Sequence, residues 1–415
     1  MTGSKVIGGE MRRVAVTGIG VVSSIGTGKD AFWTALLGGT SGISTVSSFD
    51  STSFPVHIGG EVRDFDPLRY LTPERAAVMG RATQMAIGAA KLAVADSGLD
   101  FDSVDKNRVG VSMGTTSGEP LFVEQYNDAK KAGGEDAVPA EAMGRYPCHT
   151  MPAHVALEFG AHGPVIMIPT ACAAGNYAIG YGYDLIRTGR VDHVLAGGAD
   201  AFSRITYTGF ARLGAIAPVK CQPFDKNRKG MIPGEGSGML LLEPLDAAVA
   251  RGAKIYAEIL GYGVSCDAHH MTAAHPAADG AIRCMQNAMT EAGVTVDDID
   301  YISAHGTGTP TNDRLESLAV RTLFGERASR VPMSSIKSML GHTMGAASAI
   351  EAAACSLALD TGWIPATMNH EETDPDCGVD IVANKCRKTN PKIILNNAYA
   401  FGGNNACLCL KRYVA

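Results

Sequence analysis

One cysteine of the chain lies where a thiol can act as a nucleophile. Cys172 follows the short apolar run Val165–Ile168 and precedes residues 176–187, whose apolar side chains recur at helical spacing. The cysteine therefore falls at a predicted junction between a strand and a helix. Unpaired backbone N–H groups and the positive end of the helix dipole favour the thiolate at such a position.

Two histidines distinguish this cysteine from a packing residue, which is the commoner role of a single buried thiol. His305 lies 133 residues after Cys172, in the sequence Ala-His-Gly-Thr-Gly-Thr. His342 lies 37 residues further on, in Lys-Ser-Met-Leu-Gly-His. Both stand in glycine-rich turns after apolar runs. A cysteine combined with distant histidines is typical of thiol nucleophile chemistry.

Four motifs occur in the same order in one known family. Along the chain they are the Cys172 segment, the His-Gly-Thr-Gly-Thr stretch of His305, the stretch from Lys337 to His342, and Phe401-Gly-Gly. In these motifs the chain resembles the elongating β-ketoacyl-acyl carrier protein synthases, ketosynthase II-like members of the condensing-enzyme (thiolase) superfamily that include type II polyketide ketosynthases. The resemblance runs from about Arg12 to Tyr413.

The resemblance implies a decarboxylative Claisen condensation. Cys172 would hold an acyl chain as a thioester, and a malonyl thioester on a carrier protein would lose CO₂ to give an enolate. Neutral imidazoles at His305 and His342 would donate Nε2–H bonds to the enolate oxygen, and donors of this kind are worth about 10²–10³ in rate each. The backbone N–H groups of Cys172 and Phe401 would hold the oxyanion of the final step.

Other residues receive roles from the resemblance. Lys337 and Glu351 would form a pair that orients the histidines, with an ordinary structural ion pair as the alternative. Phe401 would gate the cysteine, and Gly402 and Gly403 would let it swing. The alternative for these three residues is a packed loop anchor.

The substrate is expected to meet further positions. Thr307 and Thr309 match positions that hold the pantetheine arm, although without the resemblance they are turn residues. Asp313 follows closely and supports the same loop. Ser117 falls near a position at which bacterial fatty-acid enzymes usually carry a larger aliphatic residue that lines the acyl pocket. A small polar residue at this position would lengthen the tunnel that holds the acyl chain. Asn404, which replaces a common threonine, bears on gate motion.

Alternating predicted strands and helices indicate a layered α/β protein. Residues 255–260 run into a Gly-Tyr-Gly turn much as residues 14–16 run into Gly-Ile-Gly, which suggests a duplicated chain. The resemblance implies the thiolase-like five-layered α-β-α-β-α arrangement of two similar fused halves. We assign residues 1–10 to an extension, residues 11–250 to the half with the nucleophile, and residues 251–415 to the half with both histidines.

Several segments are expected to position the site. A continuous helix is predicted over residues 72–97, and a surface excursion that meets a partner subunit over residues 119–145. Strands over residues 300–304 and 333–336 place both histidines just past strand ends. Ligands of open α/β sheets gather at the carboxyl ends of strands.

Composition excludes several classes of protein. The 415 residues exceed the usual size of one core, so two domains or two fused halves are expected. The net charge is −6 and no long basic run occurs, so nucleic acid is not an expected partner. No apolar run approaches the ~20 residues of a membrane span.

The cysteines bear on location and cofactors. With no recognisable signal peptide, ten scattered cysteines indicate reduced thiols in a cytoplasmic enzyme. Cys407 and Cys409 alternate with apolar residues, which indicates a terminal strand rather than a metal site. We expect no metal and no cofactor, because the substrates would be carried on the phosphopantetheine of an acyl carrier protein.

Rival functions have their own requirements. A thiolase normally needs a second cysteine near the C-terminus, and residues 401–405 contain none. A coenzyme A-primed condensing enzyme usually has asparagine in place of His342. A non-catalytic chain-length subunit of a heterodimer would lack Cys172.

The expected partners are an acyl carrier protein and a second ketosynthase. The assembly is either a homodimer or a heterodimer with a chain-length-factor-like ketosynthase. The stretch around Arg75 is less basic than the usual carrier-protein docking patch. This departure and Ser117 favour type II polyketide or polyene synthesis over fatty acid synthesis.

Overall fold

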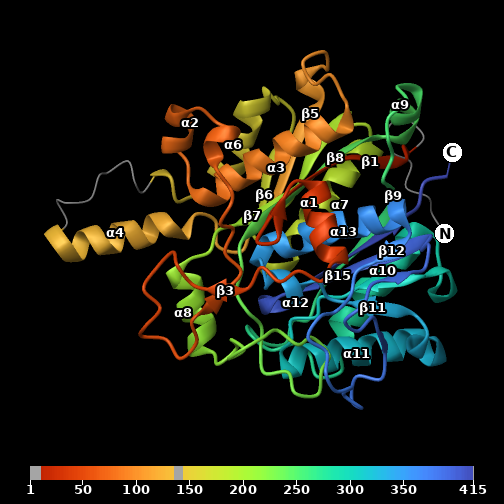
Figure 1. The fold of residues 1–415 in the computed structure, drawn as a ribbon. Coiled ribbons are helices and arrows are strands. Elements are labelled where there is room, and N and C mark those ends of the chain that lie inside the picture. The colour runs from red at the N-terminus through yellow and green to blue at the C-terminus, as the bar shows by residue number, and fades with distance from the viewer. Residues whose placement is uncertain (1–10, 135–143, 415) are drawn as a thin grey trace.

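A computed structural model of the chain describes residues 11–134 and 144–414 (Figure 1). The predicted extension over residues 1–10 lies outside the described residues, as does part of the excursion predicted over residues 119–145. Within the described ranges, no helix is both long enough and apolar enough to cross a membrane.

Two groups of five strands follow the same spatial order and together form most of one large sheet. The first group is β6 (Val165–Ile168), β5 (Val109–Gly114), β7 (His193–Asp200), β8 (Gly236–Pro244) and β1 (Val14–Ser23). The second group is β11 (Pro332–Ser334), β10 (Tyr301–Ser303), β15 (Ile393–Tyr399), β16 (Asn404–Lys411) and β9 (Ala257–Cys266).

The pairing directions repeat as well. In the first group β8 is antiparallel to β7 and β1, and in the second group β16 is antiparallel to β15 and β9. The other pairs within each group are parallel. An antiparallel contact between β1 and β9 joins the groups. The predicted duplication is confirmed, and so is the terminal strand predicted around Cys407 and Cys409.

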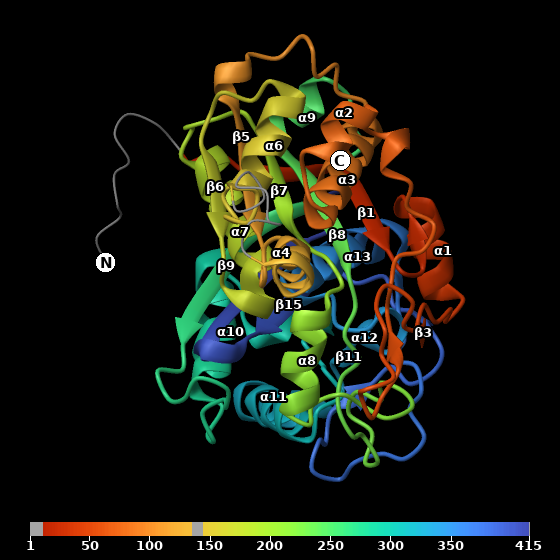
Figure 2. The same ribbon diagram turned by 90° about the vertical axis from the view of Figure 1, so that its left-hand side faces the viewer.

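Helices cover both groups of strands and fill the space between them (Figures 1 and 2). The outer layers are α3 (Arg81–Ser97) with α6 (Thr150–Phe159), and α10 (Asp279–Ala292) with α11 (Pro310–Phe324); the middle layer is α7 (Ala174–Arg187) with α13 (Ala347–Thr361). This is the predicted five-layered α-β-α-β-α arrangement.

Further helices and strands connect these layers or extend from them. They include β2 (Gly26–Thr27), α1 (Lys29–Leu37), β3 (Ser44–Thr45), β4 (Ile58–Gly59), α2 (Pro73–Ala77), α4 (Pro120–Gly133), α8 (Arg204–Arg212), α9 (Leu245–Ala250), α12 (Lys337–Leu340), β12 (Trp363–Ile364), β13 (Asp380–Ile381) and β14 (Arg387–Lys388).

The middle helices cross closely because their residues are small. Almost every residue of α13 is buried, and most of these residues are alanine or other small side chains. A Cβ atom on Gly175 of α7 would lie 2.6 Å from the backbone nitrogen of Ala349. Hydrogen bonds reinforce the crossing, since the Asn176 N–H donates to Ser348 Oγ at 3.0 Å and its Nδ2 donates to the Asn396 carbonyl at 2.9 Å. The helix that follows the nucleophile is thereby fixed to the second half.

The prediction of one continuous helix over residues 72–97 is wrong. The segment forms α2 and α3, which are separated by residues 78–80. The buried carboxylate of Glu119 accepts the backbone N–H groups of Ala82 and Thr83 and so begins a new helix. A Cβ on Gly80 would lie only 2.1 Å from this carboxylate. In the predicted excursion, α4 projects from the body (Figure 1), and its contact with a partner subunit stays a prediction.

The central crossing gives a direct test. Gly175→Ala should lower the free energy of unfolding by about 1–3 kcal/mol, because the added methyl group overpacks α7 against α13. Gly209 of α8 is the matched control, since a Cβ there would meet nothing within 4 Å. Gly209→Ala should raise stability by roughly 0.5–1 kcal/mol through helix propensity. Chemical denaturation measures both, and equal effects of the two substitutions would refute the close crossing.

Candidate active site

Cys172 lies where strand β6 passes into helix α7, as predicted. The short helix Ala171–Ala173 holds the cysteine, whose side chain is buried with 7% of its surface exposed. Ala171 has φ of 51°, a left-handed conformation that costs energy in a residue other than glycine. Such strain persists only where the surrounding structure fixes it, and it commonly marks functional turns.

Burial and a nearby positive charge act in opposite directions on the pKa of the Cys172 thiol. Burial raises the pKa of Cys172 to about 12, while the positive charge of Lys337 acts in the opposite direction. The lost hydration therefore opposes the thiolate that the helix N-terminus is expected to favour. The stabilisation of the thiolate by the helix N-terminus stays a prediction.

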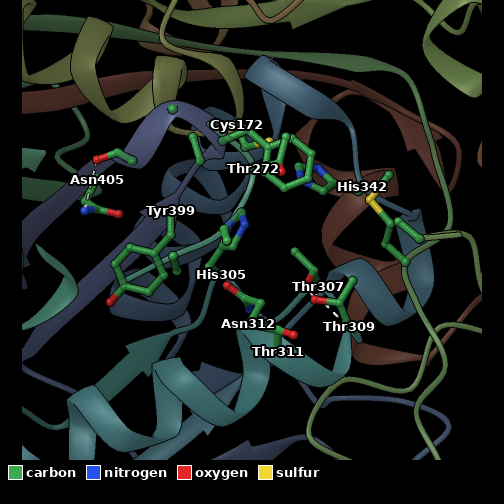
Figure 3. A pocket seen from close by; sticks show the side chains of 18 of the residues that line it. Cys172, Thr272, His305, Thr307, Thr309, Thr311, Asn312, His342, Tyr399 and Asn405 are labelled. Carbon is green, nitrogen blue, oxygen red and sulfur yellow. Dashed lines mark hydrogen bonds between the residues drawn. The ribbon is translucent and has the colours of Figure 1, made fainter. Parts of the chain in front are cut away.

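Cys172, His305 and His342 line one cavity of about 210 Å³ (Figure 3). His305 follows strand β10, and His342 follows α12, the short helix after strand β11. The two rings have centroids 5.5 Å apart and planes at 81°. The fold thus brings a cysteine of the first half and two histidines of the second half to the same space.

Both imidazoles are neutral. Burial lowers the pKa of His305 and of His342 well below 6.5, and the charge of Lys337 lowers both further. The backbone N–H of Met344 donates to Nδ1 of His342 at 3.1 Å. Because that nitrogen accepts a hydrogen bond, the proton of the His342 ring is on Nε2. His342 is therefore prepared to donate a hydrogen bond through Nε2.

The predicted pair of Lys337 and Glu351 lies behind His305. The side chains of both are 2% exposed, and Lys337 Nζ donates to a Glu351 oxygen at 2.5 Å and to the His305 carbonyl at 2.6 Å. Burial raises the pKa of Glu351 to about 7 against the opposing effect of Lys337. The pair holds the backbone that carries His305.

A buried carboxylate that the sequence did not reveal also holds this turn. Glu316 of α11 accepts the backbone N–H groups of His305 and Gly306, both at 2.8 Å. Asp313, one turn earlier, accepts the Gly308 N–H at 3.2 Å and supports the loop as expected. The available signal was their spacing of three residues just after the histidine motif, which places both on one face of a helix.

The predicted gate forms one wall of the cavity. Phe401, Gly402 and Gly403 line it, and the Phe401 ring lies 6.0 Å from the ring of Phe210 in α8. Phe401 is 41% exposed, and the two glycines have φ of 79° and 74°, which other residues rarely adopt. The Gly402 N–H donates to the Met271 carbonyl at 2.7 Å and joins the gate to a neighbouring loop.

The remaining predicted positions divide into two groups. Thr307 and Thr309 line the cavity with hydroxyl oxygens 2.8 Å apart. Tyr399, at a position not predicted from the sequence, also lines the cavity, and its ring centroid lies 5.8 Å from that of His305. Ser117 is not among the described residues that line this cavity. Its N–H donates to Asp200 at 2.9 Å, so its place in an acyl pocket stays a prediction.

The state of the imidazoles is measurable. In the protein labelled with ¹⁵N-histidine, the rings of His305 and His342 should stay neutral as the pH falls from 8 to 5.5, because burial disfavours the charged ring. An imidazole in water is half protonated near pH 6.5. Single alanine variants assign the signals, and an imidazolium at either position above pH 6 would contradict the buried, neutral pair.

The buried ion pair predicts an asymmetry between single and double substitutions. Lys337→Ala should cost about 3–5 kcal/mol in unfolding free energy, because it leaves Glu351 without its partner. The double variant Lys337→Met with Glu351→Gln should recover at least half of this loss. Arg283→Ala, which breaks an exposed pair with Asp279, is the control and should have little effect. A single-variant cost as small as that of the control would exclude the role of the pair.

Comparison with known proteins assigns both halves of the chain to domains of one family. Residues 11–248 match the family described as Beta-ketoacyl synthase, N-terminal domain, and residues 256–371 match Beta-ketoacyl synthase, C-terminal domain. The chain is 41% identical to the tetracenomycin polyketide synthase ketoacyl synthase alpha subunit of Streptomyces glaucescens, with 97% of each chain covered. It is 38% identical to the 3-oxoacyl-[acyl-carrier-protein] synthase 2 of Coxiella burnetii, with 97% of this chain and 99% of the relative covered.

Solved structures agree with these relatives. The ishigamide ketosynthase/chain length factor superposes with a TM-score of 0.94 at 45% identity, covering 97% of this chain and all of that one. A type II polyketide synthase ketosynthase in complex with its acyl-carrier protein gives a TM-score of 0.90 at 32% identity, covering 98% and 100%. With matches along both halves and a cysteine and two histidines in one cavity, the chain belongs to the β-ketoacyl synthase family of condensing acyltransferases.

Proposed function

We propose that the chain is a β-ketoacyl-acyl carrier protein synthase that extends an acyl chain by decarboxylative Claisen condensation. The observation that carries the proposal is the convergence of Cys172 with two neutral imidazoles in one buried cavity. A thiol can hold an acyl group, and neutral ring N–H groups can stabilise an enolate without changing their own charge.

The first step loads the acyl chain. The Cys172 sulfur attacks the acyl thioester of the carrier protein, its proton passes to the departing carrier thiol, and a thioester forms on Cys172 as the carrier thioester breaks. Thr307 and Thr309 hold the pantetheine arm, and Phe401 moves aside on Gly402 and Gly403. The position of these residues along the wall of the cavity supports these roles.

The second step produces and uses the enolate. Malonyl-carrier protein loses CO₂, and Nε2–H groups of His305 and His342 stabilise the enolate oxygen. The enolate carbon attacks the acyl carbon on Cys172, and the backbone N–H groups of Cys172 and Phe401 hold the resulting oxyanion. The sulfur then leaves as a thiolate, which takes up a proton from water, and the β-ketoacyl chain remains on the carrier. Lys337 and Glu351 position His305, and no separate cofactor takes part.

We further propose type II polyketide synthesis as the pathway, with an acyl carrier protein and a chain-length-factor-like ketosynthase as partners. The names of the Streptomyces relative and of the ishigamide structure support this choice. The Coxiella relative supports the rival, a homodimer in fatty acid synthesis. Native mass, measured with and without the co-expressed ketosynthase-like partner, distinguishes the homodimer from the heterodimer. A homodimer that persists unchanged in the presence of that partner would exclude the heterodimer.

Two further features of the chain belong to the same proposal. Its ten cysteines are free, which supports a reducing cytoplasmic location. Among the described residues that line the cavity, Cys172 is the single cysteine, which weighs against a thiolase. Its presence also weighs against a non-catalytic chain-length subunit. The division of the chain after residue 250 stays part of the proposal.

Replacement of the nucleophile tests the proposal. Cys172→Ala should abolish formation of β-ketoacyl product from acyl- and malonyl-carrier protein, because no acyl-enzyme can form. It should retain decarboxylation of malonyl-carrier protein, for which the two histidines suffice. Cys386→Ala, which removes a half-buried cysteine that is not among the described residues lining the cavity, is the matched control and should condense normally. Mass spectrometry of the carrier protein measures both reactions, and product formation by Cys172→Ala would exclude this function.

A further inference from the structure

A buried carboxylate outside the predicted site links the two halves beside the cavity. Asp200 ends strand β7 and is 0% exposed. Its Oδ1 accepts the Thr115 hydroxyl at 2.9 Å and the Ser117 N–H at 2.9 Å. Its Oδ2 accepts the Thr116 N–H at 2.8 Å and the Gly345 N–H at 2.7 Å. All four donors are neutral, and one of them comes from the other half.

The first three donors tie Asp200 to the strand of the nucleophile. Residues 115–117 form the turn after β5, which lies between β6 and β7 in the sheet. The backbone N–H of Thr115 also donates to the carbonyl of Ile168, the last residue of β6. The cysteine follows that strand four residues later. The Asp200 carboxylate is thus anchored on the framework that carries Cys172.

The fourth donor belongs to the turn that sets the tautomer of His342. Met344 donates its N–H to Nδ1 of His342, and the next N–H of the chain, that of Gly345, donates to Asp200. Met344 has φ of 54°, so the turn is held in a conformation that a non-glycine residue rarely adopts. A Cβ on Gly345 would lie 2.5 Å from the Thr116 nitrogen, which shows how closely the turn contacts the first half.

We propose that Asp200 is a positioning residue for His342. The Asp200 carboxylate holds the Met344-Gly345 turn so that Nδ1 of the His342 imidazole accepts a hydrogen bond and its Nε2–H points into the cavity. The inference rests on the proposed function, in which His342 stabilises the enolate. A carboxylate suits this place because it presents only acceptors to four donors. An asparagine side chain in place of Asp200 would direct its own amide N–H groups toward backbone N–H donors, so the hydrogen bonds that hold the turn would be lost.

Three variants separate positioning from simple stabilisation. Asp200→Asn should lower malonyl decarboxylation about 100-fold, the loss typical of one misplaced oxyanion donor. It should lower acylation of Cys172 by less than tenfold, because that step does not use His342. Thr115→Val keeps the carboxylate but removes one donor to it, together with the acceptor of the Gly118 N–H, and should reduce decarboxylation by about tenfold and spare acylation. Glu119→Gln, at a buried carboxylate that caps α3, should change the two rates by the same small factor.

A spectroscopic measurement is independent of turnover. In ¹⁵N-histidine spectra, His342 should be the pure Nε2–H tautomer in the unaltered enzyme and a mixture of tautomers in Asp200→Asn. Unchanged tautomer, or equal losses of decarboxylation and acylation in every folded Asp200 and Thr115 variant, would overturn the inference. If Asp200→Asn does not fold, Thr115→Val alone decides between these outcomes.

His342→Ala distinguishes failure of this inference from failure of the proposed function. If that variant still decarboxylates malonyl-carrier protein at the normal rate, the proposed role of His342 fails. If His342→Ala loses the reaction while the Asp200 and Thr115 variants keep it, only the positioning role is wrong.

Discussion

The close crossing of α7 and α13 is the constraint on which the site depends. The nucleophile is in the first half and both histidines are in the second, so the halves must meet within a few ångströms for the groups to share one cavity. Gly175 permits this approach, and hydrogen bonds of Asn176 to Ser348 and to the Asn396 carbonyl fix its register. The site therefore forms only because small residues at this crossing let the two helices pack closely.

Burial at this crossing also sets the charge of every reacting group. Loss of water raises the pKa of the Cys172 thiol and lowers the pKa of both imidazoles, so burial favours the neutral form of all three groups. The charged side chains of Lys337 and Glu351 form a buried pair behind His305. A cavity of this kind favours stabilisation of a transient anion by fixed donors, because the donors need no rearrangement when the charge appears.

The sequence predicted those features whose signals are local. Cys172, His305 and His342 stand in short motifs with distinctive neighbours, and the repeated strand-to-glycine pattern indicated the duplicated fold. Features created by tertiary contacts were missed. The break before α3 depends on Glu119, a residue distant in the chain, and the acidity of Cys172 depends on burial that a helix-terminus argument does not include. Glu316 and Asp200 gain their importance only from the N–H groups that the fold turns toward them.

The central claim is that two neutral imidazoles converge on one substrate oxygen next to Cys172. A crystal structure with a stable analogue of the malonyl-derived enolate on a pantetheine arm tests it most directly. We predict that the oxygen of the analogue lies at hydrogen-bond distance, about 3 Å, from Nε2 of both His305 and His342. An oxygen that contacts neither ring, or that is held by other groups away from the Cys172 sulfur, would contradict the account.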